Sequence, residues 1–352
     1  MALLADVEAP APAAVSRPIA IVGAGTIVRV AHLPAYRKAG FNVRGIFDVD
    51  RERATALADE FGLPQVYGDL DELLADPAVQ IVDVAIPAEF QPEVAARAAG
   101  SGRHLLCHKP LAVSLREAER LVADVRRAGV KLVVNQQTRY APAIVTLRKL
   151  LEHGVLGRPT RLAFDFGFYE DSPWWNAMAE PALRGDCIHT LDVARALLGE
   201  PDHVRALAWR EQGQRAIGTT IVEILLSYSE HLGARITSNS IWWPDDMRAD
   251  VELQGTDGVV RASLSEWTHY PIPLPDRLEL VLRDEPSVRY VPAYRTSHIP
   301  DAFIATMHQL MIAIEDDAEP ELSGEENLRT LALLEAVSSA ISSGNAERVG
   351  AP

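Results

Sequence analysis

Short apolar runs alternate with amphipathic segments along the first 140 residues. The apolar runs predict strands at 19–22, 43–47, 81–86, 104–107 and 131–134. The segments between them predict helices at about 27–39, 51–61, 69–74 and 90–99, and another helix that begins after Ser114. Continuous apolar runs are typical of parallel strands that are buried on both faces. Their alternation with helices therefore predicts a doubly wound parallel sheet.

The pattern changes after Tyr140. A helix at about 142–153 precedes strands with period-two alternation at 160–168, 204–210, 219–229, 234–241, 249–254 and 259–264. Gly255-Thr-Asp-Gly258 separates two of these strands and predicts a hairpin turn. One helix at 188–198 ends at Gly199, and two more are expected at 302–314 and 325–341. These features predict an open, mostly antiparallel sheet with helices on one face.

A glycine-rich bend follows the first predicted strand. Gly23 permits a tight turn out of the strand, and Gly25 lets a pyrophosphate approach the backbone at the start of the next helix. Asp48 ends the second strand, 23 residues beyond Gly25, where a carboxylate binds the ribose 2′-hydroxyl. That charge repels a 2′-phosphate, so NAD is favoured over NADP. The third glycine of the motif is Val28 here, and a bend that binds no nucleotide is the alternative.

Two further groups of residues are candidates for catalysis. Lys109, in Cys107-His-Lys-Pro110, follows a parallel strand at the edge where ligands bind, and could stabilise a developing alkoxide. His189 lies in the first turn of the 188–198 helix, with Asp186 at the expected N-cap and Asp192 on the same face. Histidine can take the hydroxyl proton of an alcohol. A solvated lysine and a packed core histidine are the alternatives.

An aromatic pair, Trp174-Trp175, lies on a loop just before this helix. It could line a sugar or ring pocket, or serve only as packing between domains.

Composition narrows the class of protein. With 48% hydrophobic and 24% charged residues, the 352-residue chain is typical of a globular protein of about two domains. A net charge of −15 argues against nucleic acid or an anionic membrane as the main partner. No uncharged apolar stretch approaches the ~18 residues of a membrane span. Cys107 and Cys187 fit a reducing cytoplasm, although a disulfide, or a zinc site with His108 and His189, is an alternative.

Taken together, these motifs resemble the Gfo/Idh/MocA oxidoreductase family over nearly the whole chain. In that family a Glu-Lys-Pro motif supplies a catalytic lysine, which corresponds to Lys109. The active-site histidine precedes a Leu-Asp-x-x-Arg-x-Leu-Leu-Gly pattern and corresponds to His189. The family's Gly-Thr-x-Gly turn corresponds to residues 255–258, and its Asn-x-Arg-Phe/Tyr segment to residues 135–140, with Arg139 facing the active site.

The resemblance implies the following organisation: a lead-in at 1–17, an NAD-binding Rossmann domain at 18–140, and a substrate and oligomerisation domain at 141–352. Catalysis is expected from Lys109, His189 and Asp186. The expected cofactor-binding residues are Gly23, Gly25, Thr26, Ile27, Asp48, Ile86, Pro87, Gln91, His108 and Lys109. Arg139, Trp175, Asp186 and His189 are expected to bind substrate, and no metal is expected.

The implied reaction is hydride transfer between nicotinamide and a ring secondary alcohol of a sugar, aminosugar or cyclitol, by a homodimer or homotetramer. Three departures stand out. The motif glutamate is His108, the aspartate four residues before the histidine is Gly185, and a histidine after the Ile86-Pro87 turn is Gln91. A catalytically weakened NAD-binding regulator and a sugar-nucleotide ketoreductase are therefore the alternatives.

Overall fold

The computed structural model describes residues 16–241, 247–265 and 274–350, apart from the Trp174 side chain. Most of the expected lead-in lies outside these residues. The described chain forms two compact units: a first unit of residues 16–137 and 299–328, and a second unit of 138–298 and 329–350. The sequence-based division lies at residue 140, whereas the two units divide between residues 137 and 138, and residues 299–328 return to the first unit.

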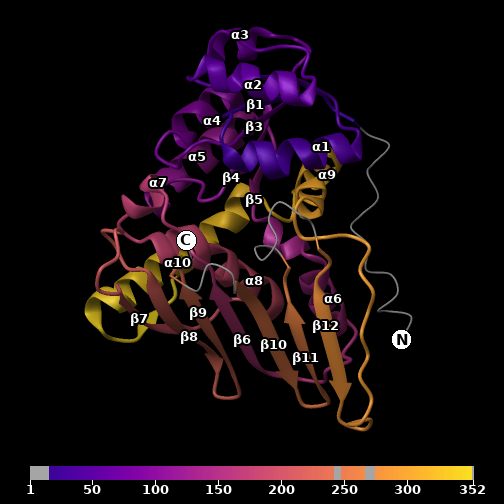
Figure 1. The fold of residues 1–352 in the computed structure, drawn as a ribbon, viewed down its shortest axis with the longest axis vertical. Helices are drawn as coiled ribbons and strands as arrows, with labels where there is room; N and C mark the ends of the chain where they lie inside the picture. Colours follow the sequence, from indigo (N-terminus) through magenta and orange to yellow (C-terminus); the bar gives the residue numbers. More distant parts are fainter. Residues whose placement is uncertain (1–15, 242–246, 266–273, 351–352) are drawn as a thin grey trace. The chain divides into compact units, whose positions relative to one another are not determined.

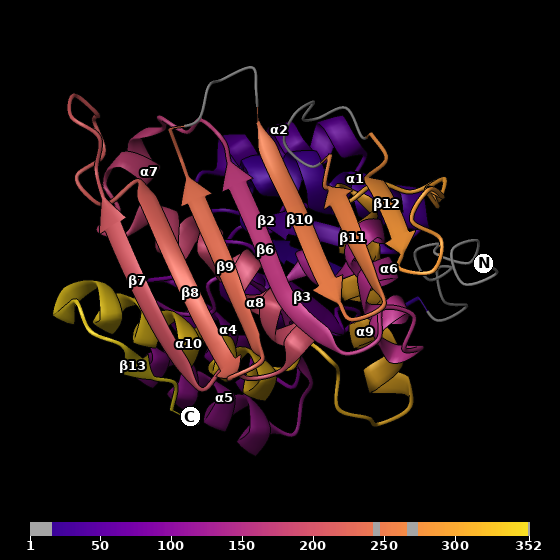
Figure 2. The ribbon, with the colours of Figure 1, turned by 90° about the horizontal axis from the view of Figure 1, so that it is seen from below.

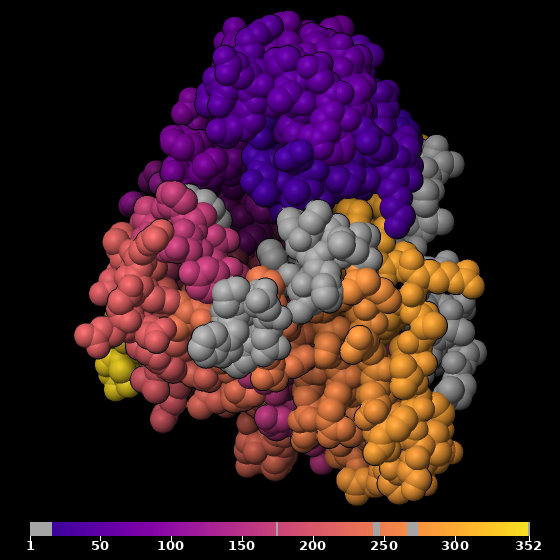
Figure 3. Space-filling model, viewed as in Figure 1, coloured from indigo at the N-terminus to yellow at the C-terminus, as the bar shows by residue number. Residues whose placement is uncertain are grey.

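The first unit contains a five-stranded parallel sheet, as predicted. Its order is β2-β1-β3-β4-β5, and its strands are β1 (Ile19–Val22), β2 (Val43–Phe47), β3 (Ile81–Val84), β4 (His104–His108) and β5 (Leu132–Asn135). The order runs outward from β1 in both directions, so β1 and β3 form the switch point where ligands bind in such sheets. In the space-filling view, the indigo and violet residues of this unit form one continuous body (Figure 3).

Helices cover both faces of this sheet. They are α1 (Leu33–Ala39), α2 (Arg51–Phe61), α3 (Leu70–Ala75), α4 (Gln91–Gly100), α5 (Leu115–Ala128) and α9 (Asp301–Glu315). Within the unit, α4 packs against α5 on one side and α1 against α9 on the other (Figure 1). The predicted stop at Gly62 is confirmed by its φ of 68°, and Ser114 accepts from the Glu117 N–H as expected of an N-cap.

The first helix differs from its prediction. Residues Val28–His32 form a π-helical segment before α1 begins at Leu33. Val28, which takes the place of the third glycine, is fully buried and opens this wider turn. A π turn is a local feature often found at functional sites, and hydrophobic periodicity does not detect it.

The second unit contains an eight-stranded sheet of order β12-β11-β10-β6-β9-β8-β7-β13, in which only the β6–β9 pair is parallel. Its strands are β6 (Pro159–Gly167), β7 (His203–Trp209), β8 (Ile221–Ser229), β9 (Leu232–Asn239), β10 (Arg248–Gly255), β11 (Gly258–Ser263), β12 (Arg277–Leu282) and β13 (Glu347–Arg348). The predicted hairpin is confirmed, since Gln254 pairs with Val259 across Thr256-Asp257. The mostly antiparallel sheet is confirmed, whereas β12 and β13 were not predicted.

Helices lie on one face of this sheet, as expected. They are α6 (Pro142–Glu152), α7 (Pro173–Asn176), α8 (Ile188–Leu198) and the later part of α10 (Gly324–Ser343). Helix α8 packs on β6 and β9, and α6 packs on α8. Figure 2 views the opposite face of the sheet, on which none of the described residues forms a helix. Within the described ranges, no helix is both long and apolar enough to cross a membrane.

Candidate active site

The glycine bend is built by the switch point of the first unit. Gly23 has φ +109°, and a Cβ added there would lie 2.3 Å from the Ala85 carbonyl oxygen at the end of β3. A Cβ added at Gly25 would meet nothing within 4 Å. Thr26 and Ile27 then start the helix, with the Arg29 N–H donating to the Gly25 carbonyl. The bend therefore has the close strand packing and the open space that a pyrophosphate requires.

We expect alanine at the two glycines to separate folding from binding. Gly23→Ala combines a strained φ with the Ala85 clash, and should lower the free energy of unfolding by about 3 kcal/mol. Gly25→Ala should leave stability within about 1 kcal/mol, yet weaken NADH binding at least tenfold, because its methyl group enters the pyrophosphate space. Calorimetry and NADH fluorescence titration check both variants. Equal NADH affinity of Gly25→Ala and wild type would show that the bend holds no dinucleotide.

Asp48 is tied directly to this bend. Its Oδ2 accepts from the Ala24 N–H at 2.6 Å, and its Oδ1 accepts from the Asp50 N–H at 2.8 Å. These two bonds fix the carboxylate at the carboxyl end of β2, beside the glycine turn. Asp48 therefore lies next to the glycine bend in space, although it is 23 residues beyond Gly25 in the sequence.

The next two strand ends bring further predicted residues to the same edge. Ile86 lies near Gly23, and Pro87 follows it in the turn before α4. Gln91 opens α4, is fully buried, and donates through Nε2 to the Pro110 carbonyl at 2.7 Å. Gln91 therefore holds the turn after β4, which contains Lys109 and a cis Lys109–Pro110 peptide bond. The contact gives Gln91 a supporting position beside Lys109.

A buried polar cluster beneath this edge was not predicted. His32 Nδ1 lies 2.7 Å from Asp83 Oδ2, and the Tyr36 hydroxyl donates to the same oxygen at 2.7 Å. Asn135 Nδ2 lies 3.5 Å from His32 Nε2, and the His32 and His108 rings are 5.7 Å apart. The one sequence signal was a carboxylate, Asp83, inside an otherwise apolar strand. Such a residue needs buried partners.

Titration in this cluster follows from burial. Desolvation, and then the charges of His32 and Lys109, hold the pKa of His108 well below its usual range, so the ring is neutral near pH 7. Burial and the Asp83 carboxylate raise the pKa of the Tyr36 hydroxyl well above its usual range. A neutral imidazole therefore stands where the family motif has a glutamate, next to Lys109.

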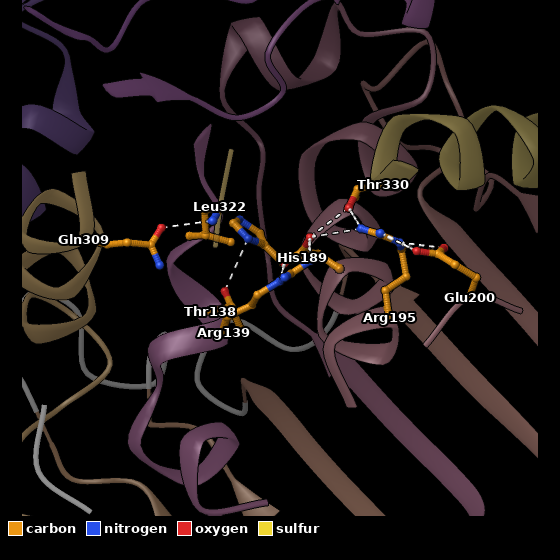
Figure 4. Close-up of polar contacts among 9 residues, drawn as sticks. Thr138, Arg139, His189, Arg195, Glu200, Gln309, Leu322 and Thr330 are labelled. Atoms are coloured by element: carbon orange, nitrogen blue, oxygen red, sulfur yellow. Dashed lines mark hydrogen bonds and ion pairs between the residues drawn. The ribbon is translucent and has the colours of Figure 1, made fainter. Parts of the chain in front are cut away.

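In the second unit, His189 is held by residues that precede α6. Thr138 Oγ1 lies 3.3 Å from His189 Nδ1, and both side chains are buried (Figure 4). The neighbouring Arg139 donates through Nε and Nη2 to the two Asp192 oxygens at 2.6 and 2.8 Å. Arg139 was expected to face substrate, and this bidentate pair gives its guanidinium a structural partner on α8.

The Asp192 carboxylate is the centre of a wider network. Thr330 Oγ1 donates to Asp192 Oδ1 at 2.8 Å and accepts from Arg195 Nη1 at 2.6 Å (Figure 4). Arg195 also pairs with Glu200 at 2.5 Å. Burial acts to raise the pKa of Glu200, but the Arg195 hydrogen bonds and charge outweigh it and leave that pKa below its usual value. The sequence placed Asp192 on the His189 face but did not reveal this network.

Asp186 does not cap a helix, so the N-cap expectation was wrong. A π-helical segment, Pro181–Cys187, runs directly into α8, and Asp186 is a buried residue inside it. The proline at the first position starts the helix earlier than the aspartate suggested.

Trp175 is buried in the second unit, with its ring edge-to-face on Phe168 at 5.4 Å. A Cβ added at Gly185 would lie 2.2 Å from the Trp175 indole. A side chain at position 185, such as the family's aspartate, would therefore require the buried Trp175 indole to move. The side chain of Trp174, its predicted companion, lies outside what the structure describes.

Both cysteines, Cys107 and Cys187, are buried and free. Burial raises the pKa of each thiol, so both are protonated. The disulfide alternative is therefore wrong. Among the described residues, no group of three or more His, Cys, Asp or Glu side chains is arranged to hold a metal ion.

Comparison with known proteins agrees with this architecture. D-apiose dehydrogenase of Paraburkholderia graminis is 29% identical over 335 residues, covering 90% of this chain and 85% of that protein. 1,5-Anhydro-D-fructose reductase of Ensifer adhaerens is 27% identical over 338 residues, covering 94% and 97%. A crystal structure of an oxidoreductase from Agrobacterium radiobacter, in complex with NAD⁺, L-tartaric acid and magnesium, is 25% identical with a TM-score of 0.83, covering 96% and 99%.

Two family models match successive parts of the chain. The model of the oxidoreductase family with an NAD-binding Rossmann fold matches residues 17–136, and the model of the GFO/IDH/MocA C-terminal domain matches residues 144–261. They correspond to the parallel sheet with its glycine bend and to the sheet that carries α8. The resemblance seen in the sequence is thereby confirmed, and the chain belongs to the Gfo/Idh/MocA oxidoreductase family.

Proposed function

We propose that the protein is an NAD-dependent dehydrogenase that oxidises a ring secondary alcohol. The observation that carries the proposal is the glycine bend with the Asp48 carboxylate fixed on it, at the same sheet edge as Lys109. Gly25 and Asp48 would hold the pyrophosphate and the adenosine ribose. Thr26, Ile27, Ile86 and Pro87 would complete the cofactor site, supported by His108 and Gln91. The nicotinamide, when bound, accepts hydride.

The chain's own residues would manage the proton and the charge. His189 would take the hydroxyl proton of the alcohol as general base, or return it in the reverse reaction. Lys109 would donate a hydrogen bond to the reacting oxygen and stabilise its developing negative charge. Asp186 and Trp175 would bind the remaining hydroxyl groups and the ring, whereas Arg139, whose guanidinium pairs with Asp192, would act by positioning α8. The clamp from Arg139 to Asp192 supports this assignment, because it fixes the helix that carries His189.

The substrate class rests on relatives that act on sugars: one is a D-apiose dehydrogenase and another a 1,5-anhydro-D-fructose reductase. We assign this chain a sugar, aminosugar or cyclitol. The test is NADH formation at 340 nm across a panel of pentoses, hexoses, anhydrosugars, aminosugars and inositols. Turnover of at least one of them is expected. If the protein binds NADH but oxidises none of these compounds and reduces none of the corresponding ketones, the alternative function, a catalytically weakened NAD-binding regulator, would be favoured.

Asp48 should set the choice of cofactor. Asp48→Asn keeps the side-chain shape, removes the charge that repels a 2′-phosphate, and retains one of the two hydrogen bonds that the carboxylate accepts. We expect the ratio of NADPH to NADH affinity to rise about tenfold or more, measured by fluorescence titration of both nucleotides. Asp50→Asn is the matched control, since Asp50 caps α2 through its own carboxylate and asparagine caps equally well. An Asp48→Asn ratio no different from that of Asp50→Asn would remove Asp48 from the ribose site.

A homodimer or homotetramer is part of the same proposal. The helix-free face of the sheet exposes Leu207, Trp209 and Leu225 on β7 and β8. Beside them on β9, Arg235 lies opposite Leu225 and pairs with Asp165 of β6. Apolar side chains flanked by ion pairs suit a self-complementary interface. Light scattering should give two or four chains, and a monomer at micromolar concentration would contradict this.

Two buried, free thiols support a cytoplasmic location.

A further inference from the structure

We propose that Thr138 is a positioning residue that sets the tautomer of His189. In this assignment His189 Nδ1 carries a hydrogen and donates a hydrogen bond to Thr138 Oγ1. Nε2 is then the basic nitrogen of the neutral ring. The catalytic consequence rests on the proposed function, whereas the tautomer itself does not.

The contact is local and shielded from water. Thr138 Oγ1 lies 3.3 Å from His189 Nδ1, and the two residues are only 4% and 8% exposed. Figure 4 shows the threonine, on the short 3₁₀ turn Gln137–Tyr140, directed at the imidazole. At such exposure, water is a poor substitute for a lost protein partner. The threonine hydroxyl is therefore a group on which the protonation of Nδ1 depends.

A second contact fixes the two partners against each other. The residue after Thr138 is Arg139, and its bidentate pair with Asp192 lies one helical turn beyond His189 on α8. Thr138 and Arg139, which are neighbours in the turn, therefore contact His189 and Asp192 on the same face of α8. Because Asp192 also accepts from Thr330, the clamp is anchored on α10 as well. A movement of the turn that separated Thr138 from His189 would also strain the buried ion pair between Arg139 and Asp192.

The need for this arrangement follows from position 185. In the family pattern an aspartate stands four residues before the histidine, but here that residue is Gly185. The Trp175 indole fills the space, since an added Cβ would lie 2.2 Å from it. A carboxylate at 185 would therefore require the indole to move. Thr138 offers Nδ1 of the imidazole a neutral hydrogen-bonding oxygen.

The direction of the hydrogen bond follows from the work of a base. His189 alternates between neutral imidazole and imidazolium, and both ring nitrogens of the imidazolium are donors. A threonine that accepts from Nδ1 keeps its bond in both states, whereas one that donates to Nδ1 must lose it on protonation. An accepting Thr138 also stabilises the imidazolium more than the neutral ring, because a charge-assisted bond is stronger.

The direct test is ¹⁵N NMR of ring-labelled histidine, with the His189 signals identified from His189→Gln among the ten histidines. In wild type we expect neutral His189 to be protonated at Nδ1. Thr138→Val removes the acceptor but keeps the shape, and should move the proton toward Nε2. Thr138→Ser should restore the wild-type spectrum. Thr146→Val is the matched control, since its buried hydroxyl bonds Pro142 and Tyr294 instead.

A kinetic readout follows if the proposed function holds. Thr138→Val should lower kcat about tenfold, with rescue by Thr138→Ser. It should also shift the acid limb of the kcat/KM profile to lower pH, because the imidazolium has lost its acceptor. If His189→Ala leaves turnover unchanged, the base assignment fails, but the NMR result still decides the tautomer. Identical His189 spectra for wild type and Thr138→Val, or a wild-type signal protonated at Nε2, would overturn the inference.

Discussion

Replacing Lys109 by alanine should lower kcat for alcohol oxidation by about two to four orders of magnitude. The ammonium group is assigned to the reacting oxygen, whose negative charge grows as the proton and the hydride leave. A methyl group at that position offers neither charge nor hydrogen bond. NADH affinity should change by no more than about threefold, because the pyrophosphate and ribose contacts belong to other residues. Stopped-flow hydride transfer and fluorescence titration measure the two quantities separately.

Lys131→Ala is the matched control for this experiment. Lys131 precedes β5 at the amino edge of the same sheet, where it pairs with the exposed Asp317 at 2.9 Å. Losing this solvent-screened surface pair should change stability little, and it touches no ligand-binding edge. If Lys109→Ala retains turnover within a few-fold of wild type, or if Lys131→Ala loses as much, the assigned role of Lys109 fails.

The second large effect concerns stability. Asp192→Ala should lower the free energy of unfolding of the second unit by about 3–5 kcal/mol, because it removes the buried carboxylate that accepts two hydrogen bonds from Arg139 and one from Thr330. Arg139 and Asp192 are 4% and 2% exposed, so water cannot replace the lost carboxylate. All six tryptophans lie in residues 138–298, so tryptophan fluorescence during urea titration reports on this unit.

A half-exposed pair in the same unit provides the comparison. Asp165 binds Arg235 at 2.7 Å, but the two side chains are 34% and 36% exposed. Asp165→Ala should therefore cost about 1 kcal/mol or less. Equal losses of unfolding free energy for Asp165→Ala and Asp192→Ala would mean that the buried Arg139–Asp192 pair stabilises the unit no more than a half-exposed pair does.

Much of the fold could be predicted from local pattern. The parallel strands, the stop at Gly62, the cap at Ser114 and the hairpin at residues 255–258 all follow from periodicity and turn chemistry within a few residues. The glycine bend was also predictable, because its function requires particular residues at fixed spacing. These features depend on short-range physics that the sequence states directly.

Other features depend on contacts between distant residues. The π-helical segments at Val28–His32 and Pro181–Cys187 widen a helix by tertiary packing, which periodicity does not record, and the second of them displaced Asp186 from its expected cap. The pairing of Asp192 with Arg139 and of Asp83 with His32 joins residues 53 and 51 positions apart. Strand β12 was missed although its sequence, with apolar residues at Leu278, Leu280 and Leu282, has the period-two pattern of a strand, so this element could have been predicted from the sequence.

We propose that Lys109 and His189 act as one acid–base unit on one alcohol. A double-mutant cycle on single-turnover hydride transfer tests it, with wild type, Lys109→Ala, His189→Ala and the double variant saturated with NAD⁺ and substrate. We expect the double variant to lose about as much rate as the worse single variant, since residues of one unit are strongly non-additive. Losses that multiply, or single variants within a few-fold of wild type, would contradict the claim.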